Sequence, residues 1–265
     1  MTVPVHLDAP GCRASFDPSD GGRLTSLMVS GHELLVSRQA DAFRWGSFVL
    51  APWVGMLRHA NLNFEGADYQ LPTNRPHVAV HGLVTERSWR VAGDGVLTID
   101  VDDPWPWRFR VTQRARLTDS SIAFDLLLES DTPMPAAVGW HPWFVRRLAA
   151  PDGHVVEIEL HAEPGQMWAN DADGLPTGEL TKPAQRPWDY CFRDLRAPPV
   201  LRWPGILELT VESSCSDWVF FDEEQNGICV EPWSAPPNSL NMADPFVVTS
   251  TNPLVASMTW TWRRL

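Results

Sequence analysis

The sequence is poor in lysine, tyrosine and cysteine. Of its 265 residues only Lys182 is a lysine, and acidic residues outnumber basic ones by 33 to 21, which gives a net charge of −12. This balance argues against nucleic acid or an anionic membrane as a partner, because both are bound by basic patches. The four cysteines form no CxxC pair and have no histidines at zinc spacing. We therefore expect buried, reduced thiols in a cytoplasmic protein.

Long apolar runs are also absent. No stretch approaches the ~18–20 unbroken apolar residues of a membrane helix. The first residues, MTVPVHLDAPGCR, lack the basic and then apolar regions of a signal peptide. With 44% hydrophobic and 20% charged residues, the composition is typical of a globular chain with a large core.

Few windows are free of helix breakers, because 24 prolines and 17 glycines are spread along the whole chain. The segments between them alternate apolar and polar residues, which indicates half-buried strands. The candidate strands are 96–102, 108–117, 121–130, 154–162, 206–214 and 257–265, with a hairpin around Ser30-Gly31 in 21–37. No linker divides the chain. We predict an all-β sandwich or barrel and a single domain over residues 1–265.

Several well-known site motifs are missing. The sequence has no GxGxxG, no P-loop and no GxSxG. His77 and His81 stand four apart in HVAVH, a spacing that could bind a metal on a helix. Valine and alanine between them favour an extended segment, and no third ligand is near in the sequence. We therefore predict no metal site.

Tryptophan, by contrast, is abundant, with 14 residues against only 2 tyrosines. Four titratable residues lie in tryptophan-rich or proline-rich segments: His81 in AVHGLV shortly before Trp89, His141 in GWHPWF, Asp189 in PWDYCF and Glu231 in ICVEPWSAPPNSLN. A flat indole packs on the C–H face of a sugar ring, while carboxylates and imidazoles bind its hydroxyls. This composition is typical of a carbohydrate site.

In their order along the chain, these segments resemble the aldose 1-epimerase (galactose mutarotase) family. The matching segments are GGRLTSLMVSGHELL, LAPWVGMLRHANLNFEGADYQLPTN, HVAVHGLV, GWHPWF, DADGLPTGEL with WDYCF, and CVEPWSAPPNSLN. The resemblance implies a mostly antiparallel β-supersandwich. It also implies the interconversion of α and β anomers of a free aldose, with a monosaccharide as partner and without metal or organic cofactor.

The same resemblance implies roles for individual residues. Glu231 falls at the general base, His141 at the general acid and His81 at a position that polarises the substrate. Asp189 falls at a hydroxyl-binding aspartate and Arg58 at a sugar-contacting arginine. We further expect Trp53, Trp143 and Trp233 to contribute to the wall of the sugar pocket, and His77 to lie at its rim.

One position departs from the family pattern. Met56 stands where a second arginine is common, so the preferred sugar need not be galactose. Arg58 and Arg75 are isolated in the sequence, which favours an unphosphorylated sugar. Two other functions stay open from the residues: a non-catalytic sugar-binding protein, and a glycoside hydrolase with Asp189 and Glu231 as its carboxylate pair. The oligomeric state is open as well.

Overall fold

Two large β-sheets make up most of the chain in the computed structural model, which describes residues 3–150 and 152–265. The first sheet has eleven strands in the order β1-β2-β3-β5-β15-β25-β24-β21-β19-β20, with β4 beside β3. Their bounds are β1 Val5–Ala9, β2 Cys12–Asp17, β3 Arg23–Val29, β4 His32–Glu33, β5 Ser47–Leu50, β15 Gly139–Val145, β19 Pro164–Asn170, β20 Pro176–Thr181, β21 Asp189–Leu195, β24 Asp217–Phe221 and β25 Gly227–Trp233.

The second sheet has eight strands in the order β10-β11-β12-β13-β27-β23-β22-β18. Their bounds are β10 Arg90–Gly93, β11 Val96–Val101, β12 Phe109–Leu117, β13 Ser121–Glu129, β18 Glu159–His161, β22 Val200–Trp203, β23 Leu207–Ser213 and β27 Leu254–Arg264. Short pairs complete the fold: β6 Met56–Leu57 with β9 Ala79–Val80, β7 Asn61–Phe64 with β8 Ala67–Gln70, β14 Met134–Pro135 with β26 Val247–Val248, and β16 Arg147–Ala149 with β17 Val155–Glu157. Two 3-10 turns, η1 Arg58–Ala60 and η2 Ser239–Asn241, are the only helical elements of the described residues.

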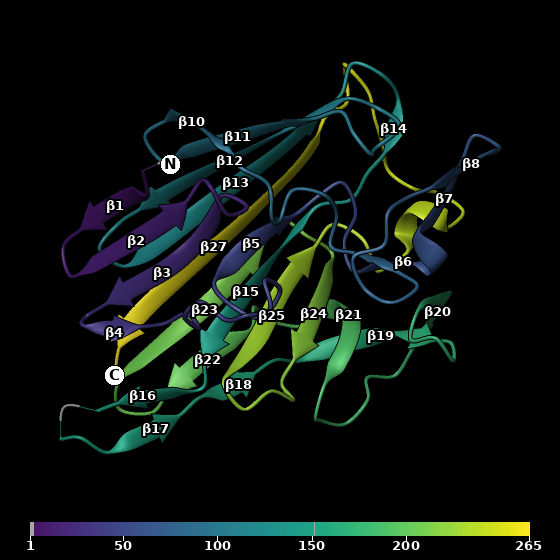
Figure 1. Ribbon diagram of the computed structural model, residues 1–265. Coiled ribbons are helices and arrows are strands. Elements are labelled where there is room, and N and C mark those ends of the chain that lie inside the picture. Colours follow the sequence, from purple (N-terminus) through teal and green to yellow (C-terminus); the bar gives the residue numbers. More distant parts are fainter. Residues whose placement is uncertain (1–2, 151) are drawn as a thin grey trace.

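The two sheets pack face to face (Figure 1). Trp140 of β15 crosses the layer between them, and its indole N–H donates to the side-chain oxygen of Gln113 on β12 at 3.1 Å. The ring of Phe144, also on β15, meets that of Trp260 on β27 at 4.9 Å. Each large apolar side chain buried in this way contributes roughly 1.5–3 kcal/mol. The predicted all-β sandwich is confirmed.

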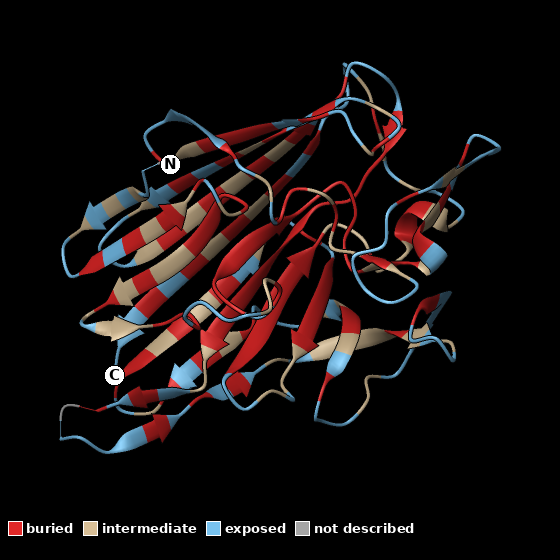
Figure 2. Cartoon of the chain, in the orientation of Figure 1, coloured by how far each residue is buried: buried red, intermediate tan, exposed pale blue. Residues whose placement is uncertain are grey.

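Alternation along the sequence decides which side chains enter this layer. In β12 and β13, buried residues alternate with more exposed ones almost without a break (Figure 2). The register then places Ile122 opposite Trp260 and Phe124 opposite Met258, so the apolar faces coincide. The strands predicted at 108–117, 121–130, 206–214 and 257–265 are therefore confirmed, as is the hairpin at Ser30-Gly31.

The single strand predicted over residues 154–162 is wrong, because the chain forms β17 and β18 instead. Ile158 separates the two, and its backbone N–H donates to the carbonyl of Arg146 at 2.7 Å. The first half pairs with β16 and the second with β22 of the second sheet. The alternation of apolar and polar residues over 154–162 continues across the point where the chain changes from one partner strand to another, so the sequence does not reveal the break.

The central strands of the first sheet are covered on both faces. Every residue of β5 and β25, and all but the last of β15, is buried (Figure 2). Because successive side chains of a strand point to opposite faces, one face must pack on the second sheet while the other is covered by something else. Part of that cover comes from the segment between β5 and β10, and part from the loop segments around residues 41–44 and 169–174.

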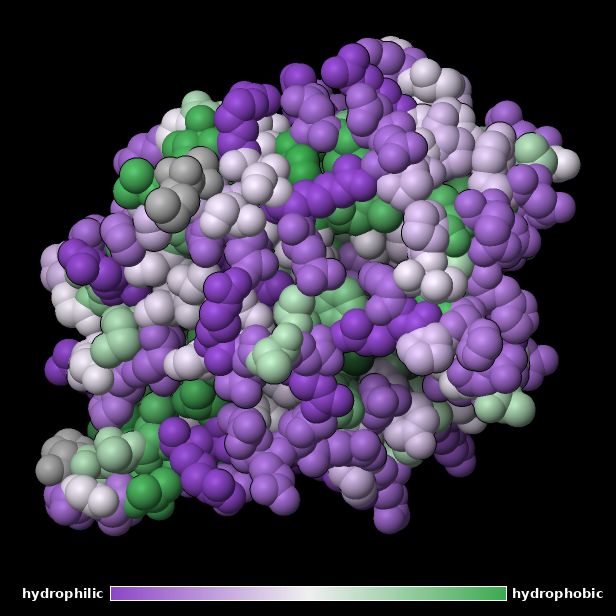
Figure 3. All heavy atoms as spheres, in the orientation of Figure 1, coloured by the Kyte–Doolittle hydropathy of each residue, from purple (hydrophilic) through white to green (hydrophobic). Residues whose placement is uncertain are grey.

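The outer surface is mainly polar. Hydrophilic side chains cover most of the face seen in Figure 3, and apolar ones appear between them in small groups. Within residues 3–150 and 152–265, none of the helical turns has the length and apolar character needed to span a bilayer.

Gly82 ties the covering segment to the sheet. Its φ is +78°, and a Cβ placed there would lie 2.0 Å from the carbonyl oxygen of Ala51. We expect Gly82→Ala to lower the free energy of unfolding by about 3 kcal/mol, the sum of left-handed backbone strain and a clash with backbone. Gly66 is the matched control, since its φ of +79° is the same but a Cβ there would have no other atom within 4 Å. Gly66→Ala should lose only about 1 kcal/mol in equilibrium urea unfolding; equal losses would contradict the close approach.

Candidate active site

A cavity of about 1020 Å³ lies on the face of the first sheet that points away from the second sheet. Strands β15, β21, β24 and β25 form its floor, and loop segments around residues 41–44, 75–81 and 169–174 form its walls. Six of the nine predicted site residues line it, namely His81, His141, Trp143, Asp189, Glu231 and Trp233. Segments that lie far apart in the sequence therefore converge on one cavity.

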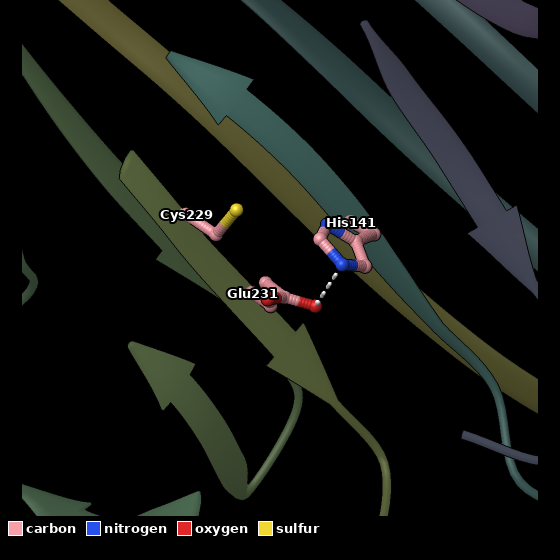
Figure 4. A group of neighbouring side chains, drawn as sticks. All are labelled: His141, Cys229 and Glu231. Carbon is pink, nitrogen blue, oxygen red and sulfur yellow. Dashed lines mark ion pairs between the residues drawn. The ribbon is translucent and has the colours of Figure 1, made fainter. Parts of the chain in front are cut away.

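His141 and Glu231 lie opposite each other on neighbouring strands. The antiparallel register of β15 and β25 pairs Gly139 with Trp233 and Trp143 with Cys229, and this histidine and glutamate lie midway between those pairs. Their side chains point toward each other, with Nε2 of His141 3.5 Å from Oε2 of Glu231 (Figure 4). Both are almost fully buried, His141 at 7% and Glu231 at 2% exposure.

Burial disfavours the charged form of each partner. It lowers the pKa of His141 well below the usual histidine value, and nearby His81 and Arg23 lower it further. Burial also raises the pKa of Glu231 well above the usual glutamate value, and the negative charge of Asp189 adds to this. Burial therefore favours a protonated glutamate and a neutral imidazole over a carboxylate and an imidazolium.

His81 reaches the cavity from an unusual backbone position. Its φ is +64°, in the left-handed region that costs a residue other than glycine about 1 kcal/mol or more. A hydrogen bond from its backbone N–H to the carbonyl of Gly55, at 2.8 Å, holds it there. Its ring stands edge-on to that of His141 at 5.0 Å. Burial, with the charge of Arg75 second, lowers the pKa of His81 to about 3, so the ring is neutral.

Aromatic rings enclose the imidazole of His141. Phe48 of β5 stacks on one face at 4.8 Å, and Trp143 lies nearly parallel at 5.7 Å. The indole N–H of Trp143 donates to the backbone carbonyl of Phe43 at 2.7 Å, which fixes its orientation. The ring of His141 is thus held rigidly, with one edge turned toward Glu231.

Asp189 supplies a further carboxylate at the first position of β21. Loss of surrounding water raises its pKa, and the charge of Glu223, which also lines the cavity, raises it further. Neither Asp189 nor Glu223 has a basic partner within ion-pair distance among the described residues. Asp189 is therefore free to accept hydrogen bonds from a ligand.

Four buried polar atoms of the cavity residues have no hydrogen-bond partner within the described part of the chain. They are Nδ1 of His81, Nδ1 of His141, Oε2 of Glu231 and Nε1 of Trp233. An unpaired buried polar group costs about 1–3 kcal/mol. Such a concentration at one cavity is what a ligand rich in hydroxyl groups would satisfy.

Three predicted site residues are not brought to the cavity. Trp53 is 1% exposed and stacks on Trp105 at 5.6 Å, so it belongs to the core. His77 is exposed, with φ +63°, in the turn between Arg75 and Val78. The motif alone could not reveal these orientations, because it does not show which side of a loop faces the sheet.

Arg58, the third of these residues, forms ion pairs with Asp171 and, at 2.5 Å, with Asp173. Both acids lie in the turn between β19 and β20, and Asp171 lines the cavity. Arg58 thus holds a wall segment in place from behind instead of pointing at the cavity itself.

Sequence reasoning also missed residues that line the cavity. Arg75 and Asp41 form an ion pair at 2.6 Å, and the guanidinium of Arg75 lies 4.4 Å from the centre of the Phe43 ring. Glu223 follows β24 in a loop. For Arg75, the only signal in the sequence was its position two residues before the HVAVH segment. Asp41 and Glu223 had none, because loops carry no periodic pattern.

His141, Glu231 and Cys229 are the one group in the described residues that could be considered for a metal, and their ligand atoms lie within 4.8 Å of one another (Figure 4). Tetrahedral zinc would need about 3.3–3.8 Å between ligand atoms and a thiolate. Burial instead raises the pKa of the Cys229 thiol well above its usual value. These residues do not fit a metal, and we assign none.

The ion pairs of Arg58 lead to a prediction. Replacing Arg58 with Gln should loosen the turn at residues 171–174 by roughly 1 kcal/mol, because partly exposed ion pairs contribute about 0.2–1 kcal/mol each. Hydrogen exchange of backbone amides there should accelerate roughly fivefold. Arg90→Gln removes an ion pair with Asp100 on the second sheet and is the control. Unchanged exchange at 171–174 in Arg58→Gln would contradict the anchoring.

Comparison with known proteins identifies the family and the fold. The family model "Aldose 1-epimerase" matches residues 5–199, so Glu231 lies beyond the matched range. The Uncharacterized protein YihR of Escherichia coli K12 is 24% identical over 251 residues, covering 83% of this chain and 80% of that protein. The crystal structure of a galactose mutarotase-like protein from Clostridium acetobutylicum superimposes with a TM-score of 0.82 at 16% identity, covering 98% of this chain and 95% of that one. An aldose epimerase homologue from C. elegans gives 0.80 at 14% identity, with 100% of both chains covered. The chain belongs to the aldose 1-epimerase family.

Proposed function

We propose that the protein is a mutarotase that interconverts the α and β anomers of a free, unphosphorylated aldose. The observation that carries this proposal is the buried pair of His141 and Glu231, which face each other across 3.5 Å at a cavity lined by unpartnered polar atoms. A proton donor and a proton acceptor side by side are what ring opening and reclosure of an aldose require.

Glu231 is the base and His141 the acid in this proposal. The C1 hydroxyl gives Glu231 Oε2 the hydrogen bond that it lacks, which favours the carboxylate and moves the shared proton to His141. Glu231 then takes the C1 hydroxyl proton while His141 protonates the ring oxygen, and the C1–O5 bond breaks. After rotation about C1–C2 the steps reverse on the other aldehyde face. Protons balance, because each residue regains its starting state.

Neighbouring residues orient the sugar. His81 is neutral, so it can donate or accept a hydrogen bond without placing a charge beside His141. Asp189 accepts hydrogen bonds from hydroxyls further along the ring, and its distance from basic residues leaves it free for this role. Trp143 and Trp233 offer apolar surface to the C–H faces of the sugar.

The charges of the cavity favour a substrate without a phosphate. Asp189 and Glu223 line it without a basic partner, whereas Arg44 and Arg75 are tied to carboxylates. A phosphate would enter beside unpaired carboxylates and would have to displace an acidic partner to reach an arginine. A neutral aldose meets neither obstacle.

Polarimetry of freshly dissolved α-glucose, α-galactose, xylose and arabinose tests the proposal directly. The wild-type protein should accelerate the change in optical rotation for at least one of them. Glu231→Gln should lose roughly 10²–10⁴-fold in rate, because it removes the base, while it still binds the sugar. Glu212→Gln, at the exposed position of β23 in the second sheet, is the matched control and should keep the full rate. Full activity in Glu231→Gln would refute its role as base, and sugar binding without acceleration would favour a binding protein.

Charge selectivity provides a second prediction. If glucose or galactose is turned over, the 6-phosphate of the same hexose should show at least roughly tenfold lower kcat/KM, because of repulsion by the unpaired carboxylates. The difference should shrink in Glu223→Gln and at high salt, since screening weakens repulsion. Comparable kcat/KM values for the two substrates at low salt would contradict this interpretation of the cavity.

A further inference from the structure

Arg23 is a buried cation with no ion pair among the described residues, and the charges of Asp20, Glu86 and Asp17 act on it only from further away. It begins β3, its side chain is 0% exposed, and no carboxylate lies within ion-pair distance of it in the described part of the chain. Its Nη1 donates to the backbone carbonyl of Trp45 at 2.7 Å, but Nε and Nη2 have no partner. Burial lowers the pKa of Arg23 to about 10, so the guanidinium remains charged at neutral pH.

The guanidinium is the first layer of a stack that ends at the candidate active site. Its carbon lies 4.3 Å from the centre of the Trp45 ring and 4.4 Å from that of Phe48. Phe48 in turn stacks on His141 at 4.8 Å, with 26° between the ring planes. One aromatic ring therefore separates a permanent positive charge from the imidazole.

A buried charge is less favourable for stability than an apolar side chain of similar volume. An unpaired ion in a protein interior is strongly destabilising, and cation–π contacts offset only part of that cost. A methionine or leucine would fill a similar volume without this cost. The cation lies one ring away from His141, which points to an electrostatic effect on the imidazole.

We propose that Arg23 is a positioning residue, which acts on His141 through the ring of Phe48 by opposing a second positive charge on the imidazole. The histidine then stays neutral at rest, and the imidazolium formed during the reaction releases its proton readily to the ring oxygen. The benefit to catalysis rests on the proposed function. The electrostatic effect of Arg23 on the pKa of His141 does not.

Other groups that face His141 do not supply the same effect. Glu231 and Cys229 reach it from β25, and burial keeps the thiol protonated because it raises the pKa of Cys229. His81 faces it from the loop after β9 and is neutral, since its pKa is about 3. Of the groups that lower the pKa of His141, Arg23 is the one that keeps a full charge at neutral pH.

Two variants separate charge from packing. Arg23→Gln removes the charge but keeps a donor for the carbonyl of Trp45, whereas Arg23→Lys keeps a positive charge. The pKa of His141 is measured by NMR on protein labelled with ¹⁵N at histidine, and the acid limb of mutarotation is measured in parallel. We expect both to move upward by about one pH unit in Arg23→Gln, from a unit charge at roughly 9 Å, and to stay near wild type in Arg23→Lys.

The NMR measurement decides the inference even without activity. A pKa of His141 that is unchanged in a folded Arg23→Gln protein overturns it, whether or not the protein is a mutarotase. A raised pKa without mutarotation of any sugar supports the inference and rejects the proposed function. If Arg23→Gln does not fold, Arg23→Met fills a similar volume without the charge. The pKa of His141 should rise in that variant as well, and an unchanged pKa overturns the inference.

Discussion

The antiparallel register between β15 and β25 is the constraint on which the candidate site depends. It places His141 opposite Glu231 on the cavity side of the sheet, and it sends Trp140, one residue earlier, into the layer between the sheets. Because side chains alternate along a strand, a slip of one residue would exchange these faces. The core packing of Trp140 and the facing pair of His141 and Glu231 are therefore fixed by one set of backbone hydrogen bonds.

Exclusion of water from the site determines the protonation of His141 and Glu231. Loops cover the central strands, and the same burial that packs apolar side chains there disfavours charge on both members of the pair. In water, glutamate would be ionised and histidine largely neutral at pH 7, and the two would hold no proton between them. Burial shifts the pKa of Glu231 upward, which favours a pair that carries the proton exchanged in the proposed reaction.

The sequence predicted the fold class and named six residues that the structure brings to one cavity, but it did not predict their arrangement. Strands such as β12 and β13 could be predicted because their alternation is regular over the whole strand. His141 and Glu231 stood out because each lies in a distinctive aromatic or proline-rich segment. Their direct opposition depends on the pairing of strands far apart in the chain, which no local pattern encodes. Trp53 and Arg58 were placed wrongly relative to the cavity for a similar reason, since a motif does not reveal which side of its loop faces the sheet.

The division of labour between strands and loops has a consequence for how such a protein can diversify. The proposed proton-transfer pair lies on strands in the middle of a sheet, whereas much of the cavity wall belongs to loops such as the turn anchored by Arg58. Insertions or exchanges in those loops alter the space around a sugar while the strand register stays intact. New sugar preferences can therefore arise, by evolution or by design, without rebuilding the chemistry beneath them.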